Sequence, residues 1–374
     1  MEMKIKWSNF QEIKDKKVRL FAELFATKKS NDIISNIHTE VRVINLNNEF
    51  EFPVTINNEA IENSFVCSPY TAYGLYAKDE LKHKIKSKII QYPLLVLIKL
   101  IAFLLRKGKI DKNIHINNFL LSTNPYPDWS GEHAAPLTAF LKSEFPKHAL
   151  IFRSLNRYQH TSLIQELEKN EYLKLGSRQV YIYDEPFEVW QKLKQNKHDR
   201  RIIQRKSLTQ LSHHEMFPYL EDALALYNLL YLVKYSKFNP QFTLKYFQYC
   251  HENELVHFQG FIDKEGKLKA FTGLFILGNT ITSPLVGYDT LAPQKEGLYI
   301  HAINSIMQYK FNHNLLLNLS SGAPKFKRLR GGKPSVEYSL VYIKHLTFFR
   351  RFTWSVIIFI SNKIGVPLLE KYEL

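Results

Sequence analysis

A cluster of basic residues near the carboxyl-terminal end is the first feature with chemical potential. Five cations fall within nine residues, and the pair Gly331-Gly332 lies among them. Glycines expose backbone N–H groups and guanidinium groups bind oxyanions in a fixed geometry, so this segment suits a phosphate or carboxylate group. A solvated basic loop between two strands is the alternative interpretation. The five cations are Lys325, Lys327, Arg328, Arg330 and Lys333.

A second group of cations lies on a helix predicted at 186–206. Arg201 and Arg205 are four residues apart, so they share a face of that helix. With Lys327, Arg328 and Arg330 they are candidate binding groups for an anionic donor. The alternative for the helix is a solvated basic face.

Four residues are candidate acid/base groups. Tyr288 and Asp289 stand at the end of a predicted strand, where side chains can point into a cleft. Glu296 lies in the helix that follows, and Glu337 begins a later strand. A positioned base of this kind takes the proton of an attacking amine or hydroxyl. An ordinary turn aspartate or a solvated glutamate is the alternative in each case.

Several other chemistries are not indicated. His213 and His214 are adjacent, so they diverge on a helix, whereas a metal pair needs one helical turn between its members. Ser321 lacks the flanking glycines of a hydrolase elbow. The sequence shows no P-loop or kinase signature, and we expect no metal and no tightly bound cofactor. The only cysteines, Cys67 and Cys250, favour a reducing compartment.

The elements that must position these residues follow an α/β pattern. In the second half, three alternating apolar segments predict an antiparallel meander, a helix follows, and two strands flank the basic cluster. The first half has strands and helices of its own. The predicted strands are 40–57 (a pair), 118–123, 149–156, 178–184, 255–263, 269–278, 279–289, 315–320 and 337–343; the predicted helices include 137–145, 161–169, 218–235, 241–252 and 294–311.

This order resembles a GNAT-type acyltransferase domain over roughly residues 185–345. The segments FQGFID…KAFTGLFILG, GYDT…QKEGLYIHAINSIMQY and LNLSSGAPKFKRLRGGKP carry the resemblance to the Fem-like or acetyltransferase-6 branch. It implies a bacterial protein of class α/β (α+β), with two GNAT-like halves of mixed, mainly antiparallel sheets flanked by helices. The implied domains are a degenerate amino-terminal half (1–184), the acyltransferase half (185–346) and an apolar carboxyl-terminal helix (347–374).

The resemblance also implies the reaction. GNAT enzymes carry the motif Q/R-x-x-G-x-G/A before the central helix, and this chain keeps Gln294 and Gly297 but not the second small residue. The coenzyme A diphosphate, or an RNA phosphate, is expected near Gln294 and Gly297, at the amino terminus of the helix. The acyl donor is then acyl-CoA, bound as a cosubstrate, or acyl carrier protein. The acceptor is an amine of a small or lipid-linked molecule.

Two alternatives stay open. A Fem-type transferase would draw on aminoacyl-tRNA in cell-envelope synthesis, and the formal charge of +16 suits tRNA. However, the sequence shows none of the sustained heptads of the helical pair that Fem-type enzymes often insert, which favours the acyl-CoA donor. A non-enzymatic binder of anionic membrane or nucleic acid is the third hypothesis, and it would lose nearly all affinity at high salt.

Two apolar segments with basic flanks bear on localisation. The run 92–105 predicts either a buried core helix, which we favour, or a helix lying on an anionic membrane surface. The run 348–369 is similar, with Arg350 and Arg351 before its apolar part and Trp354 within it. Neither run has the unbroken apolar length expected of a membrane span, and the amino terminus has no signal-peptide pattern. We therefore expect a cytoplasmic protein associated with the inner face of the membrane.

Overall fold

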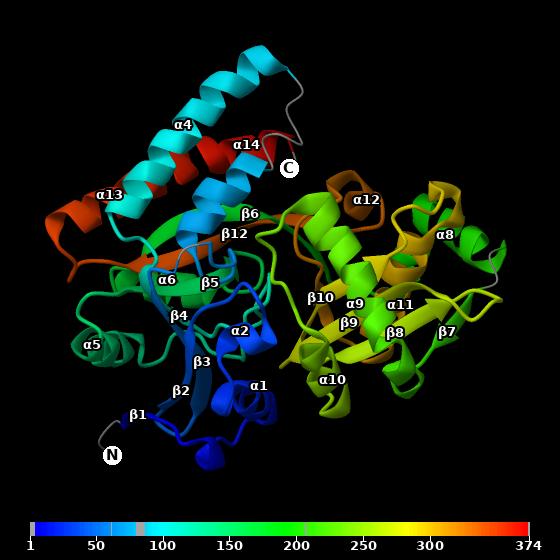
Figure 1. Ribbon diagram of the computed structural model, residues 1–374, viewed down its shortest axis with the longest axis horizontal. Helices are drawn as coiled ribbons and strands as arrows, with labels where there is room; N and C mark the ends of the chain where they lie inside the picture. Colours follow the sequence, from blue (N-terminus) through cyan, green and yellow to red (C-terminus); the bar gives the residue numbers. More distant parts are fainter. Residues whose placement is uncertain (1–3, 61, 80–86, 206–207, 373–374) are drawn as a thin grey trace.

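A computed structural model describes residues 4–60, 62–79, 87–205 and 208–372. It shows one mixed sheet of twelve strands with helices on its faces (Figure 1). The strand order is β1-β2-β3-β4-β5-β12-β6-β11-β10-β9-β8-β7. The α/β class expected from the sequence is confirmed. The two halves nevertheless share a single sheet, because their strands pair with one another at its centre.

The amino-terminal half forms one end of this sheet. Strands β1 to β4 pair antiparallel in sequence order, and β4 then pairs parallel with β5 through a crossover that contains helix α5. The strands are β1 (Ile5–Trp7), β2 (Glu40–Leu46), β3 (Phe50–Asn58), β4 (Lys112–Ile116), β5 (Ala149–Asn156) and β6 (Leu173–Tyr183). The main helices are α1 (Lys16–Ala26), α2 (Ser30–Ile33), the π-helical η2 (Thr71–Tyr76), α4 (Lys88–Lys107), α5 (Ala134–Glu144) and α6 (Thr161–Lys169).

The carboxyl-terminal half repeats this plan. Strands β7 to β10 pair antiparallel, and β10 pairs parallel with β11 through a crossover that contains helix α11. The strands are β7 (Thr209–Leu211), β8 (His257–Ile262), β9 (Leu268–Leu277), β10 (Thr280–Tyr288), β11 (Leu316–Asn318) and β12 (Lys333–Tyr342). The main helices are α7 (Phe187–Trp190), α8 (Lys194–Arg205), α9 (Leu220–Tyr227), π-helical η4 (Asn228–Tyr235), α10 (Leu244–Glu252), α11 (Leu298–Asn312), α12 (Pro324–Arg328), α13 (Phe348–Ile360), π-helical η6 (Ser361–Gly365) and α14 (Val366–Tyr372).

The two halves exchange a strand. Strand β6 comes from the first half but lies between β11 and β12, and β12 comes from the second half but lies between β5 and β6. Each half is therefore completed by a strand of the other. The division into domains at residues 184 and 346 stays a prediction, since one sheet runs through both parts.

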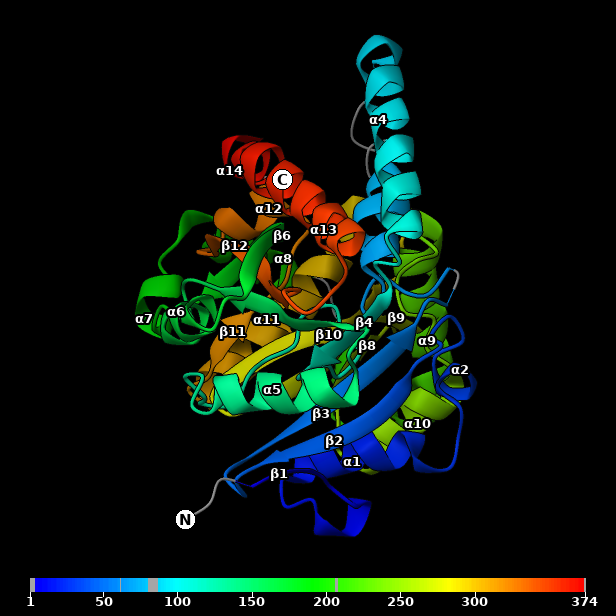
Figure 2. The same cartoon turned by 90° about the vertical axis from the view of Figure 1, so that its left-hand side faces the viewer.

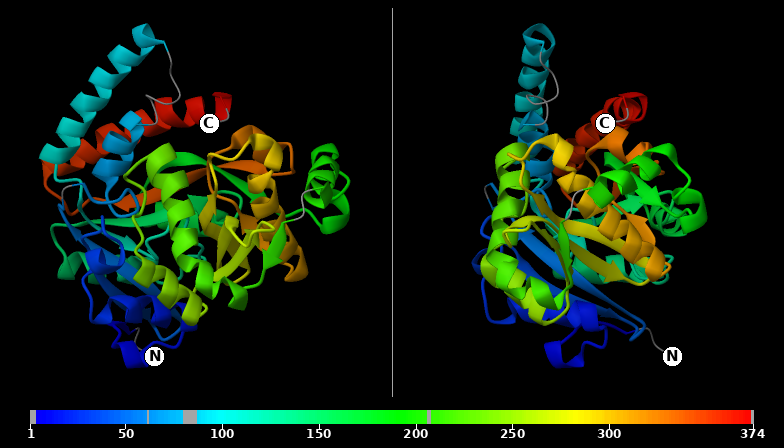
Figure 3. Two further views of the ribbon diagram at one scale, coloured as in Figure 1. Left: turned by 45° about the vertical axis from the view of Figure 1, so that its right-hand side comes forward. Right: turned by 90° about the vertical axis from the view of Figure 1, so that its right-hand side faces the viewer.

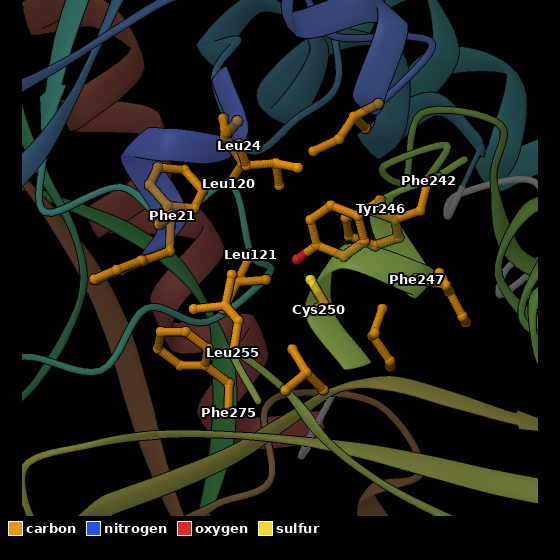
Figure 4. Close-up of a cluster of buried hydrophobic side chains, with 14 of the residues drawn as sticks. Phe21, Leu24, Leu120, Leu121, Phe242, Tyr246, Phe247, Cys250, Leu255 and Phe275 are labelled. Atoms are coloured by element: carbon orange, nitrogen blue, oxygen red, sulfur yellow. The ribbon is translucent and has the colours of Figure 1, made fainter. Parts of the chain in front are cut away.

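A hydrophobic cluster also joins the halves. Figure 4 shows Phe21 of α1 and Leu121 facing Tyr246 and Cys250 of α10, with Phe275 of β9 below Leu121. Phe119 contacts both halves, with ring centroids 5.2 Å from Phe21 and 4.9 Å from Phe275. Burial of such large side chains stabilises each by about 1.5–3 kcal/mol, so the interface is part of the folded core.

The structure differs from three sequence expectations. Residues 118–123 form no strand, because Asn118 makes side-chain bonds to Thr55 and to the backbone of Val66 and Leu120 in place of a ladder. The basic segment after β11 is not a plain loop, since it contains α12 with Pro324 at its start. The helix expected at 186–206 is divided into α7 and α8, and position 206 lies outside the described residues.

The apolar helices correct two further expectations. Helix α4 is not a buried core helix: it projects from the body with Ile89, Leu100 and Phe103 exposed (Figure 2). Within the described residues, the continuous helix Phe348–Lys371 is long and apolar enough to cross a membrane, although no span was expected there. Length and composition alone are weak support for a span, and only 17% of its most apolar window is buried.

Candidate functional site

The parallel strands of the second half separate where a site is expected. Strand β11 pairs with β10 only from Thr280 to Thr282. A β-bulge follows between Thr282 and Leu285, and β10 then continues to Tyr288 beside β9 alone. A bulge bends its strand and ends regular pairing, and bulges are frequent next to active sites. The remainder of β10 is therefore separated from β11, and Tyr288 stands at its far end.

Tyr288 has a cation and aromatic rings as neighbours. Lys234 of η4 donates a hydrogen bond to its hydroxyl at 3.3 Å and lies 5.6 Å from its ring centroid. Tyr299, in the first turn of α11, has its ring centroid 5.6 Å from that of Tyr288. Three separate elements therefore meet at the end of β10.

More tyrosines line the same region. Tyr231 and Tyr235 of η4 have ring centroids 6.2 Å apart, and Tyr299 contacts Phe326 of α12 at 4.7 Å. Burial raises the pKa of Tyr231 and Tyr299 well above the usual range for tyrosine. Their hydroxyls stay protonated at neutral pH, so they are hydrogen-bond donors rather than bases.

A buried ion pair lies where the halves exchange strands. Arg178 of β6 donates to Glu337 of β12 at 2.9 Å, and the Glu337 side chain is only 3% exposed. Arg178 also donates to the hydroxyl of Thr123 at 2.8 Å. After burial, its positive charge is the second cause that lowers the pKa of Lys327. The carboxylate of Glu337 is held by Arg178 at the strand exchange.

Lys327 is turned inward. Its Nζ donates to the carbonyl oxygens of Leu319, Ser320 and Ser321 at 2.7, 3.3 and 2.7 Å. Burial first, and then the charge of Arg178, lowers its pKa to about 7. Three acceptors match the three N–H bonds of an ammonium group, so Lys327 fixes the chain directly after β11.

Helix α8 is held against the amino terminus of α11. Arg330 forms a two-point ion pair with Asp199 of α8, at 2.5 Å from Nε and 2.8 Å from Nη2. Ile202, one turn later, packs on Gly297, whose φ of 68° is left-handed. The cavity that Arg330 and Asp199 help to line has a volume of about 10 Å³, which is room for about one water molecule.

The remaining candidates lie around the same helix terminus. Arg201 and Arg205 are exposed on α8, and Gln294 is exposed just before Gly297. Arg201 and Arg205 lie on the helix whose Ile202 contacts Gly297, and Gln294 lies three residues before Gly297 in the chain. The amino-terminal amides of a fifteen-residue helix, beside exposed cations, suit a diphosphate group.

Three predicted residues have other surroundings. Asp289 pairs with Lys269 at 2.9 Å, which lowers the pKa of Asp289 and raises that of Lys269. Glu296 is half-buried in the short turn Gln294–Glu296, and Arg328 is half-buried at the end of α12. The positions of Asp289, Glu296 and Arg328 do not test their predicted roles in catalysis or donor binding. These roles stay predictions.

Sequence reasoning missed several residues of this region. Lys234 ends an apolar helical run whose spacing predicts only a core helix, and Arg178 opens an apolar strand. Asp199 and Tyr299 carried no motif. Among the described residues, no group of three or more His, Cys, Asp or Glu side chains could hold a metal ion.

No protein-family model matches the sequence, and no curated protein matches it. Among solved structures, "L-PGS from Bacillus licheniformis" has 15% identity and a TM-score of 0.42, covering 59% of this chain and 76% of that chain. "Crystal structure of FemX" has 12% identity and a TM-score of 0.42, covering 57% and 77%. A "tandem GNAT protein from the clavulanic acid biosynthesis pathway" has 8% identity and a TM-score of 0.41, covering 91% and 98%.

The strand connectivity agrees with the GNAT/Fem-like order that the sequence resemblance implies. The antiparallel meander β8-β9-β10, the helix α11, and the parallel strand β11 that separates from β10 give this connectivity directly. The first half repeats the parallel pair with β4 and β5. At these identities the similarity concerns the fold alone.

Proposed function

We propose that this protein is an N-acyltransferase that moves an acyl group from acyl-CoA, or from acyl carrier protein, to an amine. The acceptor is a small molecule or a lipid-linked molecule. The observation that carries the proposal is the separation of β10 from β11, with Tyr288 at the end of β10 and the amino terminus of α11 close by. No resident cofactor is required, because acyl-CoA is a cosubstrate.

The residues divide between binding and proton transfer. The diphosphate of the donor would lie against the first amides of α11, with Arg201 and Arg205 of α8 as its cationic partners. The acceptor amine attacks the thioester carbonyl, and backbone N–H groups of β10 beyond the bulge stabilise the oxyanion. Tyr288 would give its proton to the departing sulfur. The resulting phenolate, stabilised by Lys234 3.3 Å away, would then take the proton that the acceptor nitrogen loses as the amide forms.

The donor can be identified by thermal stability. A ligand that binds the folded state raises the unfolding temperature, and saturation at 100 times Kd stabilises by about 2.7 kcal/mol. We expect acetyl-CoA and longer acyl-CoA to raise the midpoint, and Arg201→Ala with Arg205→Ala to reduce the shift. If the protein is folded and neither a coenzyme A thioester nor acyl carrier protein raises its unfolding midpoint, this class of donor is excluded.

The role of Tyr288 requires a separate measurement. Tyr288→Phe is expected to lower kcat about 10²-fold or more, as loss of a general acid does, with little change in donor affinity. Tyr92→Phe, on exposed α4, is the matched control and should leave kcat unchanged. Equal activity of the Tyr288→Phe and wild-type enzymes would exclude the proton transfer assigned to Tyr288.

An aminoacyl-tRNA donor is the second candidate. Exposed Arg201 and Arg205 and the formal charge of +16 favour a polyanionic partner. In the same assay, tRNA would then raise the midpoint where coenzyme A thioesters do not. A third outcome, binding to any polyanion with loss of nearly all affinity at high salt, would indicate a non-enzymatic binder.

A further inference from the structure

Helix α4 has a stripe of exposed apolar side chains along one face. No other part of the chain that the structure describes covers this stripe. Its exposed side chains recur at helical spacing along one face, with fractional exposure between 42% and 87%. Helix α4 rises clear of the body in two views at right angles (Figures 1 and 2). The stripe consists of Ile89, Tyr92, Val96, Leu100 and Phe103.

The carboxyl-terminal helices add a second apolar face. Helix α13, η6 and α14 run continuously, and α13 lies across the same side of the molecule as the base of α4 (Figures 1 and 3). Soluble proteins rarely expose large contiguous apolar patches unless the patch binds something. The exposed apolar side chains here are Phe348, Phe349, Phe352, Phe359, Ile364 and Leu368.

Both elements are firmly attached at their bases. Buried Arg350 of α13 donates to the carbonyl oxygens of Gly108, Lys109 and Lys112, which follow α4. Trp354 is completely buried between them and the sheet. The exposed faces therefore belong to ordered helices, and the exposure is a property of the folded molecule.

The charges beside these faces are almost all positive. Helix α4 carries four cations and no carboxylate, and residues 348–372 carry four cations and one carboxylate, Glu370. Seven of the eight cations are exposed, the exception being Arg350. Apolar side chains flanked by exposed cations match a bilayer surface with anionic headgroups. The exposed cations are Lys88, Lys99, Arg106, Lys107, Arg351, Lys363 and Lys371.

We propose that α4 and α13–α14 together form a docking surface for an anionic lipid bilayer. The helices lie on the membrane rather than across it. Asn362 of η6 accepts a hydrogen bond from the backbone N–H of Gly176 at 2.9 Å, which ties the middle of the carboxyl-terminal helix to β6. A transmembrane arrangement would break this contact and move Lys363 into the hydrocarbon region, which costs about 2.5–3.5 kcal/mol for the lysine alone.

The docking surface is attached next to the candidate site. Asp79, three residues beyond η2, accepts a hydrogen bond from Ser236 at 2.8 Å, and Ser236 directly follows Tyr235 of η4. Gly176, which binds Asn362, lies two residues before Arg178. A protein held on the bilayer by these helices would keep the tyrosine-lined region close to the membrane. The proposal does not depend on the reaction assigned above.

Vesicle flotation with the full chain tests the surface. We expect the wild-type protein to float with vesicles that contain phosphatidylglycerol, and to bind at least about tenfold more weakly to pure phosphatidylcholine. Leu100→Glu with Phe103→Glu should reduce binding to phosphatidylglycerol vesicles by about tenfold or more. Since both side chains are more than 60% exposed, the far-ultraviolet circular dichroism spectrum and unfolding midpoint should not change.

The control is an equal change elsewhere. Phe217→Glu with Leu291→Glu alters two exposed apolar residues outside these helices and should leave vesicle binding unchanged. Equal loss in both double variants, or no binding by wild type, would overturn the proposal. So would a dimer that the Leu100→Glu and Phe103→Glu changes dissociate without any vesicle binding, which would make a second copy the occupant. If only detergent, and not high salt, releases the protein from the vesicles, the carboxyl-terminal helix spans the bilayer instead.

Discussion

Arg330 and Asp199 form a buried two-point ion pair that ties the end of α12 to α8. The two N–O distances are 2.5 and 2.8 Å, and the side chains are 7% and 9% exposed. The Arg330 guanidinium also lies 3.4 Å from the ring centroid of Phe326. This pair orients the helix that carries Arg201 and Arg205, so Arg330 acts on the candidate anion site through α8.

Arg330→Met should therefore destabilise the protein. The substitution leaves Asp199 buried without its partner, and breaking a buried pair in this way costs about 3–5 kcal/mol. Urea unfolding followed by fluorescence measures the change. Lys169→Met breaks the exposed pair with Glu166 and should change stability by less than about 1 kcal/mol. Equal, small effects of both substitutions would show that the buried pair does not hold α8.

The strand pattern of the second half was predictable from local signals. The apolar alternation at 255–289 and the turns at Gly266 and Gly278 give the meander β8-β9-β10, with bounds within a few residues of those observed. Strand β5 and helix α6 agree with the expected 149–156 and 161–169. Periodicity and turn residues suffice there because each element is formed by neighbours in sequence.

The strand exchange was not predictable in this way. Strand β12 pairs with β5 and β6, which lie roughly 150 to 190 residues earlier in the sequence, and no local pattern encodes such a pairing. The same reason explains the ion pairs that were missed. Asp199 with Arg330, and Arg178 with Glu337, join residues more than 130 positions apart.

Exposure was also misjudged from sequence for a physical reason. Lys327 lies in a cluster of five cations that predicts a solvated or ligand-binding segment, yet its ammonium group is buried on three carbonyl oxygens. Helix α4 is as apolar as a core helix, yet its stripe is exposed. Composition gives the hydrophobicity of a segment. Whether a face of that segment is buried depends on which neighbouring elements pack against it.

Lys327→Met is expected to destabilise by about 3 kcal/mol, because carbonyl oxygens that an ammonium group satisfied are left buried without a donor. Lys325→Met, on the same short helix but exposed, is the matched control and should change stability by less than about 0.5 kcal/mol. The difference between the two unfolding free energies isolates the buried contacts. Similar values for the two variants would show that Lys327 is solvated and available to a ligand.

Gly297→Ala should reveal two separable costs. The φ of 68° is unfavourable for alanine by about 1–2 kcal/mol, and the added Cβ would lie 2.7 Å from Ile202. Gly266→Ala has a similar φ of 76° with nothing within 4 Å, so it measures the backbone cost alone. We expect Gly297→Ala to lower the free energy of unfolding by more than Gly266→Ala does, because only the alanine at 297 meets a neighbouring side chain.

A second substitution checks the origin of that excess. Ile202→Ala removes the atom that the new Cβ meets, so Gly297→Ala should cost less in the Ile202→Ala background than in wild type. The comparison is a double-mutant cycle followed by urea unfolding. Additive costs would mean that α8 does not press on the start of α11.

A group of stacked histidines is expected to set the acid limit of stability. His213 and His251 have ring centroids 4.2 Å apart, and His213 and His257 are 5.0 Å apart. The Nδ1 of His213 accepts a hydrogen bond from the backbone N–H of Phe258, so the neutral ring is the form that fits. Burial, followed by the neighbouring histidine, lowers the pKa of His213, and the same causes lower that of His257 to about 4.

The sign of the pH dependence follows from these directions. An unfolded histidine titrates near 6.5, so between about 6.5 and 4 the unfolded chain binds protons that the folded protein does not. The free energy of unfolding should therefore fall as the pH drops through this window. His257→Gln should reduce the proton uptake on unfolding by about one proton near pH 5, measured from the slope of urea stability against pH. An unchanged slope for His257→Gln would mean that this ring is protonated in the folded protein.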